Sequence, residues 1–251
     1  MSGGNKKIKT GVILAAGLGS RLSNLNEGTT LKPLILLGGK PLILRTLYSL
    51  ECAMCNKIII VLGYKAREVR EEIIHTYKGT AQLFFIINEK YNLSNGVSVL
   101  SARKYIDTDF LLTMADHVFS DTMMKLAGDH IPQPGGATLL VDYKLDTIFD
   151  MDDATKVLSK DDKVIAIGKT IPEFNCIDTG LFVCTEGFME NLAAIYNKKG
   201  DASVTNGVQS LAGKDLMRVL DIKDSFWQDV DTPEMLDYAK KRLCSLYDGS
   251  N

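Results

Sequence analysis

Short apolar runs that alternate with helix-like patterns constrain this chain most strongly. Residues 11–16 have the sequence GVILAA and residues 57–62 have KIIIVL, with leucines at helical spacing between them from residue 41 to about 54. A continuous apolar run is typical of a strand buried on both faces, and the order strand, helix, strand indicates two parallel strands joined by a crossover helix. The sequence therefore predicts a βαβ unit and a parallel sheet.

The alternation continues and then changes in character after about residue 130. Before that point we predict helices at 66–77 and 96–105 and strands at 82–87 and 110–114. Beyond it we predict strands at 137–142, 163–168 and 180–183, an extended segment at 226–230, and helices at 185–199, 206–220 and 233–246. Strands with few helices between them favour antiparallel additions to the sheet. We expect one α/β domain over 11–251, with a Rossmann-like, mostly parallel sheet and an antiparallel extension, after a flexible lead-in over 1–10.

Charge and cysteine content narrow the function classes. Lys and Arg number 29 against 31 for Asp and Glu, so there is no polycationic surface for nucleic acid or anionic lipid, and a phosphate ligand needs a local cluster of groups. The five cysteines are an odd number without a secretion signal, which indicates reduced thiols and a cytoplasmic location. We interpret Cys52 and Cys55 as packing residues on one helix face rather than redox or metal ligands. No apolar stretch is long enough to span a membrane.

A glycine-rich loop follows the first predicted strand and has the sequence LAAGLGSR, from Leu14 to Arg21. Glycines let backbone N–H groups approach a phosphate closely, and Arg21 adds a bidentate donor. A dinucleotide-binding loop needs a third glycine where this chain has Leu22. A P-loop reading of the later GKT at 168–170 fails because Lys163 stands in place of the first glycine.

Two acidic positions suit a metal that neutralises phosphate charge. Asp116 follows a predicted parallel strand at its carboxyl end, where ligands bind in open α/β sheets. Asp229 and Asp231 alternate in an extended segment, so their side chains point to one side. Asp231 is either a second ligand or a residue that caps the last helix. By strand alternation, His117 should face away from the metal unless the chain turns, and we predict a structural or pocket-lining role for it.

The loop LAAGLGSR, the later pair Lys32-Pro33, and the segments MADHVFS, IGK, CIDTGLFV and WQDVDTPEML together resemble the sugar nucleotidyltransferase superfamily. The resemblance covers about residues 10 to 240. It implies that Arg21 and Lys32 are catalytic cations, and that Asp116 and Asp229 chelate Mg²⁺. It also implies nucleotide contacts from Leu14, Ala15, Ala16, Gly17, Gly19, Ser20, Asn95, Gly96 and Ser98, although Asn95 can equally be a helix cap. The implied acceptor-binding residues are Lys169, Asp178, Thr179 and Gly180, and Lys169 would reach the acceptor's phosphate.

Within that superfamily the sequence is most similar to CTP:inositol-1-phosphate cytidylyltransferases. The resemblance implies condensation of CTP with inositol 1-phosphate to CDP-inositol and pyrophosphate. Enzymes for other phosphorylated acceptors, such as sugar 1-phosphates or phosphocholine, and a non-catalytic nucleotide or sugar-phosphate sensor are the alternatives. Some enzymes of this subgroup carry a fused membrane domain that consumes CDP-inositol. Since the sequence ends at Asn251, we expect that partner to be a separate protein, and a homodimer is an open alternative to a monomer.

Overall fold

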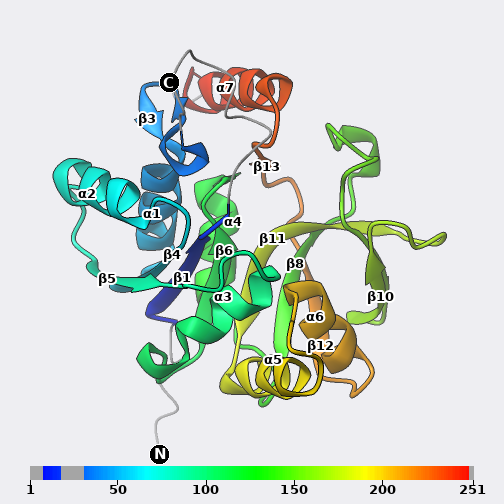
Figure 1. The fold of residues 1–251 in the computed structure, drawn as a ribbon. Helices are drawn as coiled ribbons and strands as arrows, with labels where there is room; N and C mark the ends of the chain where they lie inside the picture. Colours follow the sequence, from blue (N-terminus) through cyan, green and yellow to red (C-terminus); the bar gives the residue numbers. More distant parts are fainter. Residues whose placement is uncertain (1–7, 18–30, 249–251) are drawn as a thin grey trace, which may run out of the picture.

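A nine-stranded sheet forms the centre of the molecule (Figure 1). The computed structural model describes residues 8–17 and 31–248, with the side chains of residues 244–248 left out. The strands follow the order β5 (Gln82–Ile87), β4 (Lys57–Leu62), β1 (Thr10–Ala15), β6 (Phe110–Met114), β11 (Cys176–Cys184), β8 (Ala137–Asp142), β12 (Met217–Asp221), β10 (Lys163–Gly168) and β9 (Lys156–Lys160).

Strand direction divides the sheet into two parts. Strands β5, β4, β1 and β6 are mutually parallel, and Leu14 of β1 lies opposite Met114 of β6. Strand β11 is antiparallel to both β6 and β8, and β10 is antiparallel to β12 and β9. The carboxyl ends of β1 and β6 therefore meet at one edge of the sheet, where ligands bind in folds of this class.

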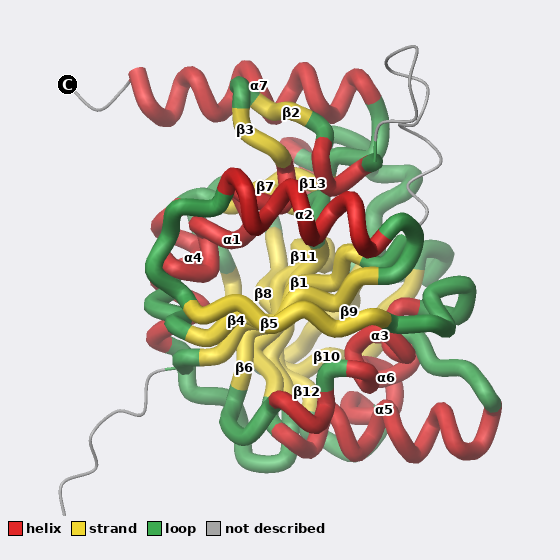
Figure 2. Tube along the Cα trace, turned by 60° about the vertical axis from the view of Figure 1, so that its left-hand side comes forward, coloured by secondary structure: helices red, strands yellow, loops and turns green. Residues whose placement is uncertain are grey.

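Helices cover both faces of the sheet (Figure 2). On one face α1 (Leu42–Cys52), α2 (Ala66–Thr76) and α4 (Asp121–Asp129) pack on side chains such as Ile13 and Ile58. On the other face α3 (Asn95–Ser101), α5 (Glu186–Lys199) and α6 (Val204–Ala212) pack on alternate residues of the same strands, such as Val12 and Ile59. Burial on both faces explains the unbroken apolar runs in the central strands.

A third, smaller core lies beyond the carboxyl edge of the parallel strands. It contains the hairpin of β2 (Leu36–Leu37) and β3 (Lys40–Pro41), the antiparallel pair β7 (His117–Phe119) and β13 (Trp227–Asp229), and the last helix α7 (Pro233–Asp248). Buried side chains in or next to these elements, including Leu37, Val118, Val230 and Leu243, contact one another there. This core holds segments from both ends of the chain over the sheet edge, as Figure 1 shows for β3 and α7.

The structure confirms the predicted α/β fold and corrects several elements. The helix predicted over 206–220 is wrong beyond Ala212, because Met217–Asp221 is the strand β12, parallel to β8. Sheet pairing overrode the apparent helical spacing there. The helix predicted over 96–105 ends at Ser101 and continues as a 3₁₀ turn, Arg103–Tyr105. The sequence analysis missed α4, β2, β3, β7 and β9, which are short or lack clear periodicity.

The chain's first residues and its cysteines also differ in detail from expectation. Ile8 is buried and Thr10 begins β1, so folded structure starts within the segment predicted as a flexible lead-in, of which residues 1–7 lie outside the described residues. Helix α1 ends at Cys52, so Cys55 is not on its face; Cys55 is nevertheless buried, and burial raises its pKa to about 12. Cys52 and Cys55 are both free thiols.

Within residues 8–17 and 31–248, no helix has both the length and the apolar character to cross a bilayer.

Candidate active site

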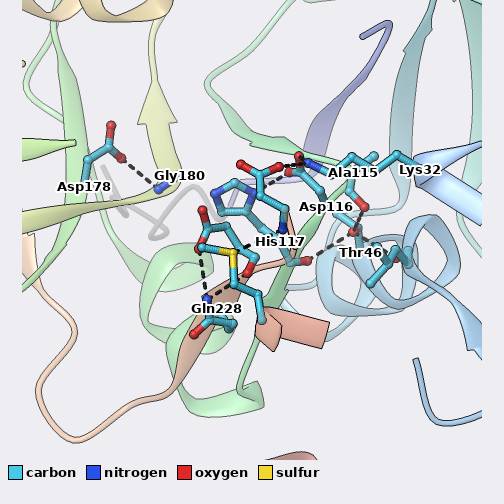
Figure 3. Close-up of polar contacts among 12 residues, drawn as sticks. Lys32, Thr46, Ala115, Asp116, His117, Asp178, Gly180 and Gln228 are labelled. Atoms are coloured by element: carbon cyan, nitrogen blue, oxygen red, sulfur yellow. Dashed lines mark hydrogen bonds and ion pairs between the residues drawn. The ribbon is translucent and has the colours of Figure 1, made fainter. Parts of the chain in front are cut away.

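The turn between β6 and β7 carries Asp116 and is held from three sides. Ala115 N donates to Leu14 O at the end of β1 (3.0 Å), and Asp116 O accepts from Val230 N after β13 (2.9 Å). From α1, the buried Thr46 hydroxyl lies 3.4 Å from the carbonyl oxygens of both Ala115 and His117 (Figure 3). The backbone around Asp116 is therefore tied to the first strand, the first helix and the last strand.

Lys32 lies between two carboxylates at this turn. It begins the 3₁₀ turn Lys32–Leu34, and its Nζ donates to Asp116 Oδ2 and to Asp231 Oδ1 (Figure 3). The three side chains are only 14%, 25% and 18% exposed, respectively. Burial opposes the charge on Lys32, but the two carboxylates outweigh it and raise its pKa. Lys32 is therefore a fixed cation, and it joins segments that are nearly 200 residues apart.

Asp231 lies just before the last helix, and its carboxylate pairs with Lys32. In the first turn of α7, Thr232 Oγ1 accepts from Met235 N (3.3 Å), which is a capping bond from the residue after Asp231.

His117 lies beside Asp116 and lines the pocket, because the chain turns before it, which is the exception that the expectation from strand alternation allowed. The chain turns at residues 115–116, and His117 Nδ1 lies 2.6 Å from Asp116 Oδ1. Burial opposes ionisation of Asp116, but Lys32 and His117 outweigh it and hold the pKa of Asp116 well below its usual range. Burial likewise opposes the charge on His117, but Asp116 raises its pKa above the usual value. Asp116 is thus a stable anion with a partner on each oxygen.

Two further carboxylates face the same site without a lysine of their own in the described ion pairs. Asp178 accepts from Gly180 N (2.8 Å), and burial, reinforced by the charge of Asp229, raises its pKa to about 6. Burial also raises the pKa of Asp229, and the charges of Asp231 and Asp116 act in the same direction. The group of carboxylates therefore creates a negative field that favours a bound cation.

A pocket of about 460 Å³ opens next to these residues. Its lining includes Asp116, His117, Asp178, Asp229 and Asp231, the segment after β8, and the start of α7. Two further lining residues, Phe149 and Tyr238 of α7, pack on each other with ring centroids 4.8 Å apart. A pocket of this volume at the carboxyl edge of the sheet can hold a small phosphorylated ligand.

The predicted acceptor residues divide between the pocket wall and the core. Lys169 lines the pocket and forms an ion pair with Asp153, and Asp178 and Gly180 also line it. Thr179 points away, because its buried hydroxyl donates to Leu140 O (2.7 Å) and holds β11 to β8. The pocket therefore brings Lys169, Asp178 and Gly180 together but not the Thr179 side chain.

The predicted nucleotide residues are only partly described. Leu14, Ala15 and Ala16 are buried at the end of β1 beside the Asp116 turn, and Gly17 follows them. The predictions for Gly19, Ser20 and Arg21 lie outside the described residues.

In the segment around α3, internal contacts account for the residues that were predicted to bind the base and ribose. Asn95 Oδ1 accepts from Val204 N (2.9 Å) at the start of α6, whose N-cap is Ser203, and Asn95 also lines the pocket. The N-cap of the helix that Asn95 begins is Ser94. Ser98 is buried and accepts from Asn88 Nδ2 (3.0 Å). A Cβ on Gly96 would collide with Ala202 O, so glycine allows α3 to approach that loop closely.

Several residues of the site were missed by the sequence analysis. Asp142 ends β8, accepts from Trp227 Nε1 (3.0 Å) and pairs with Lys144 (2.8 Å). The argument from strand ends that selected Asp116 would also have selected Asp142. Phe149 and Tyr238 have no local sequence signal, because only the fold brings the two rings together.

Comparisons with known proteins identify the family and relatives of this chain. Residues 11–145 match the family described as the MobA-like NTP transferase domain. The chain is 32% identical to a bifunctional IPC transferase and DIPP synthase of Thermococcus kodakarensis, over 92% of this chain and 50% of that protein. It is 28% identical to a bifunctional protein GlmU of Methanococcus maripaludis, over 88% of this chain and 51% of that protein. The chain spans about half the length of the curated relatives it matches.

Among solved structures, the inositol-1-phosphate CTP transferase from T. maritima has a similar fold. Its TM-score is 0.82 at 23% identity, with 95% of this chain and 98% of that chain covered. A glucose-1-phosphate thymidylyltransferase structure from Bacillus anthracis, described as putative, gives 0.80 at 18% identity, with 93% and 94% covered. These matches extend the likeness over the second half of the fold, beyond the residues that the family match covers. The chain belongs to the MobA-like NTP transferase domain family.

Proposed function

We propose that this chain transfers a cytidylyl group from CTP to the phosphate of inositol 1-phosphate, giving CDP-inositol and pyrophosphate. The observation that carries the proposal is Lys32, held between Asp116 and Asp231 at the carboxyl edge of the parallel strands and beside the pocket. A fixed cation among carboxylates suits a reaction that moves charge between phosphate groups. The relatives named IPC transferase support CTP and inositol phosphate as substrates.

The chemistry needs no protein nucleophile. The acceptor's phosphate is already an anion near neutral pH, so its oxygen can attack the α-phosphorus of CTP in line. Pyrophosphate leaves as the bond between the α-phosphorus and the oxygen bridging to the β-phosphate breaks. The Nζ of Lys32 offsets negative charge that develops in the transition state. Among the described cysteines, Cys55, Cys176 and Cys184 are buried and Cys52 is partly buried, and burial raises the pKa of all four, which fits a mechanism without a thiolate.

We assign Mg²⁺ to Asp116 and Asp229. Carboxylate oxygens are the ligands that Mg²⁺ prefers, and the burial and mutual repulsion of these side chains favour a cation. In the described part of the chain, no three His, Cys, Asp or Glu side chains are grouped to hold a metal unaided. Triphosphate oxygens and water would therefore complete the shell. When bound, Mg²⁺ supplies positive charge to the phosphates. Lys32 is the cation that the protein itself supplies there.

We place the acceptor in the pocket that Asp116, His117 and Lys169 line. The ammonium of Lys169 would exchange Asp153 for the acceptor's phosphate, and the free oxygen of Asp178 offers a hydrogen-bond acceptor to a hydroxyl group. The ring pair of Phe149 and Tyr238, which lines the pocket, would pack against the bound polyol.

Lys156 gives a prediction for the acceptor side. Its Nζ donates to Met151 O (2.9 Å) and to Lys169 O (3.1 Å). It therefore joins the loop before β9 to the residue that follows β10. Lys156→Met keeps the apolar stem but removes these two bonds and the longer ones to Asp152 O (3.5 Å) and Ala154 O (3.4 Å). We expect the KM for inositol 1-phosphate to rise about tenfold, equivalent to about 1.4 kcal/mol of lost positioning, with the KM for CTP unchanged. Initial rates with each substrate varied in turn measure both values.

The matched control for Lys156→Met is Lys163→Met in the neighbouring strand β10. Lys163 pairs with the exposed Asp215, and we expect neither KM to change. An equal rise of both KM values in Lys156→Met would contradict a specific role on the acceptor side.

Pyrophosphate release is the direct test of the proposed function. The protein is incubated with Mg²⁺, each of the four nucleoside triphosphates, and a panel containing inositol 1-phosphate, glucose 1-phosphate, glucosamine 1-phosphate and phosphocholine. We expect the fastest release with CTP and inositol 1-phosphate. Faster release with another pair would keep nucleotidyl transfer and replace the substrates. No release with any pair would favour the alternative of a non-catalytic sensor.

We also propose a cytoplasmic location and a membrane enzyme activity that consumes CDP-inositol. Free cysteines, three of which are buried, support the first point. The relatives' name, which joins an IPC transferase to a DIPP synthase, supports a coupled second activity.

A further inference from the structure

The imidazole of His117 is held on four sides by two aromatic rings, a glycine and a carboxylate. Its ring is stacked with Phe119 (centroids 6.0 Å apart, planes at 29°) and with Trp227 (6.4 Å, 16°). A third side lies against Gly180, and Nδ1 bonds to Asp116 (Figure 3). The ring therefore has one available position, and its Nδ1 is directed at one oxygen of one carboxylate.

Gly180 shows that the fold makes room for this ring. A Cβ at Gly180 would collide with Nε2 and Cδ2 of His117, and the backbone there has φ of +74°, which favours glycine. The glycine in the segment CIDTGLFV thus allows close contact between β11 and the ring, whatever else it contacts in the pocket.

The two oxygens of Asp116 have separate partners. Oδ1 lies 2.6 Å from His117 Nδ1, and Oδ2 accepts from Lys32. The terminal torsion of an aspartate is broad, so without a partner on Oδ1 the carboxylate could rotate and present either oxygen to the site. The bond from His117 removes that freedom and leaves Oδ2 directed toward the place where Lys32 lies.

We propose that His117 is a positioning residue, whose Nδ1–H donates to Asp116 Oδ1 and holds Asp116 Oδ2 toward the metal-bound triphosphate. The proposal rests on the function proposed above. It assigns the role to Nδ1 rather than to Nε2, and this choice can be tested. Outer partners of ligating groups change metal affinity or activity by about 10- to 100-fold when removed.

Two amide substitutions separate the two ring nitrogens. In His117→Asn the amide nitrogen takes the approximate place of Nδ1, and in His117→Gln it takes the approximate place of Nε2. We expect His117→Asn to stay within about threefold of wild type, and His117→Gln to lose about 10- to 100-fold in kcat with little change in the KM for inositol 1-phosphate.

Binding without turnover gives a second readout. CTP is titrated by calorimetry with and without Mg²⁺ and without acceptor, and the ratio of the two Kd values reports what Mg²⁺ adds. We expect this ratio to fall about tenfold or more in His117→Gln and to be retained in His117→Asn. His130→Gln is the control, because His130 bonds to Thr138 away from the pocket, and it should leave both readouts unchanged.

The outcomes separate this inference from the proposed function. If wild type and both His117 variants behave alike, the positioning role is wrong. If His117→Gln keeps the wild-type kcat and the Mg²⁺-dependent gain in CTP affinity while His117→Asn loses both, the positioning role is also overturned, because Nε2 would then be the important atom. If wild type releases no pyrophosphate with any substrate pair, while His117→Gln alone loses the Mg²⁺-dependent gain in CTP affinity, the function fails and the positioning role stands.

A measurement on wild type covers the case in which His117→Gln does not fold. In protein labelled with ¹⁵N-histidine, the proton on His117 Nδ1 should remain bonded and visible by NMR when CTP and Mg²⁺ are added. Its disappearance on addition of CTP and Mg²⁺ would show that His117 releases Asp116 in the complex, which contradicts the proposal.

Discussion

Lys32→Ala should lower turnover about 100-fold or more, which is the scale for loss of one preorganised charge contact in a transition state. The side chain is a buried cation with two carboxylate partners, so its removal takes away a fixed charge that water cannot replace in the same position. Rates of pyrophosphate release at saturating CTP and acceptor measure the effect. The control is Lys163→Ala, which removes an exposed cation on β10 and should leave turnover unchanged.

The same variant has an expected result that does not depend on turnover. Without Lys32, the carboxylates of Asp116 and Asp231 face one another without their shared cation, which destabilises the fold. A divalent cation that binds only the folded state then restores stability. We therefore expect Mg²⁺ to raise the Tm of Lys32→Ala more than that of wild type. Near wild-type turnover, together with an equal Tm response, would remove Lys32 from the mechanism.

Asp116→Asn should lower turnover about 1000-fold. Asp116 binds Lys32 and His117 in the structure and is the assigned Mg²⁺ ligand, and charge stabilisation by a bound metal contributes several kcal/mol to such a reaction. Pyrophosphate release as a function of Mg²⁺ concentration measures the loss, and we expect no recovery at high Mg²⁺. Asp215→Asn, in an exposed ion pair, is the matched control and should behave as wild type.

The second carboxylate of the metal site is identified by comparing Asp229→Asn with Asp231→Asn. Asp229 is the assigned ligand, so its variant should require more Mg²⁺ for half-maximal activity. Asp231 holds Lys32, so its variant should keep the Mg²⁺ requirement and lose a smaller part of kcat. The reverse pattern would move the metal from Asp229 to Asp231.

Local patterns were sufficient for the strands and helices whose burial follows from their own residues. The strands β4, β5, β6, β8 and β10 have the bounds that apolar runs predicted. Elements stabilised by distant partners were not predictable in this way. Strand β12 has a register set by pairing with β8, and the short strands β7 and β13 pair with each other across more than 100 residues of sequence, with Trp227 opposite Phe119.

The sequence by itself determined an α/β sheet with a glycine loop after its first strand, and a list of charged residues that includes Lys32, Asp116 and Asp229. It did so because apolar runs, turn residues and motifs are local properties of a chain. Only the tertiary structure decided that Asp231 shares Lys32 with Asp116, and that His117 faces Asp116. These contacts join segments far apart in the chain or depend on a single turn, and their geometry is set by the packing of β13, α7 and β2 over the edge of the sheet.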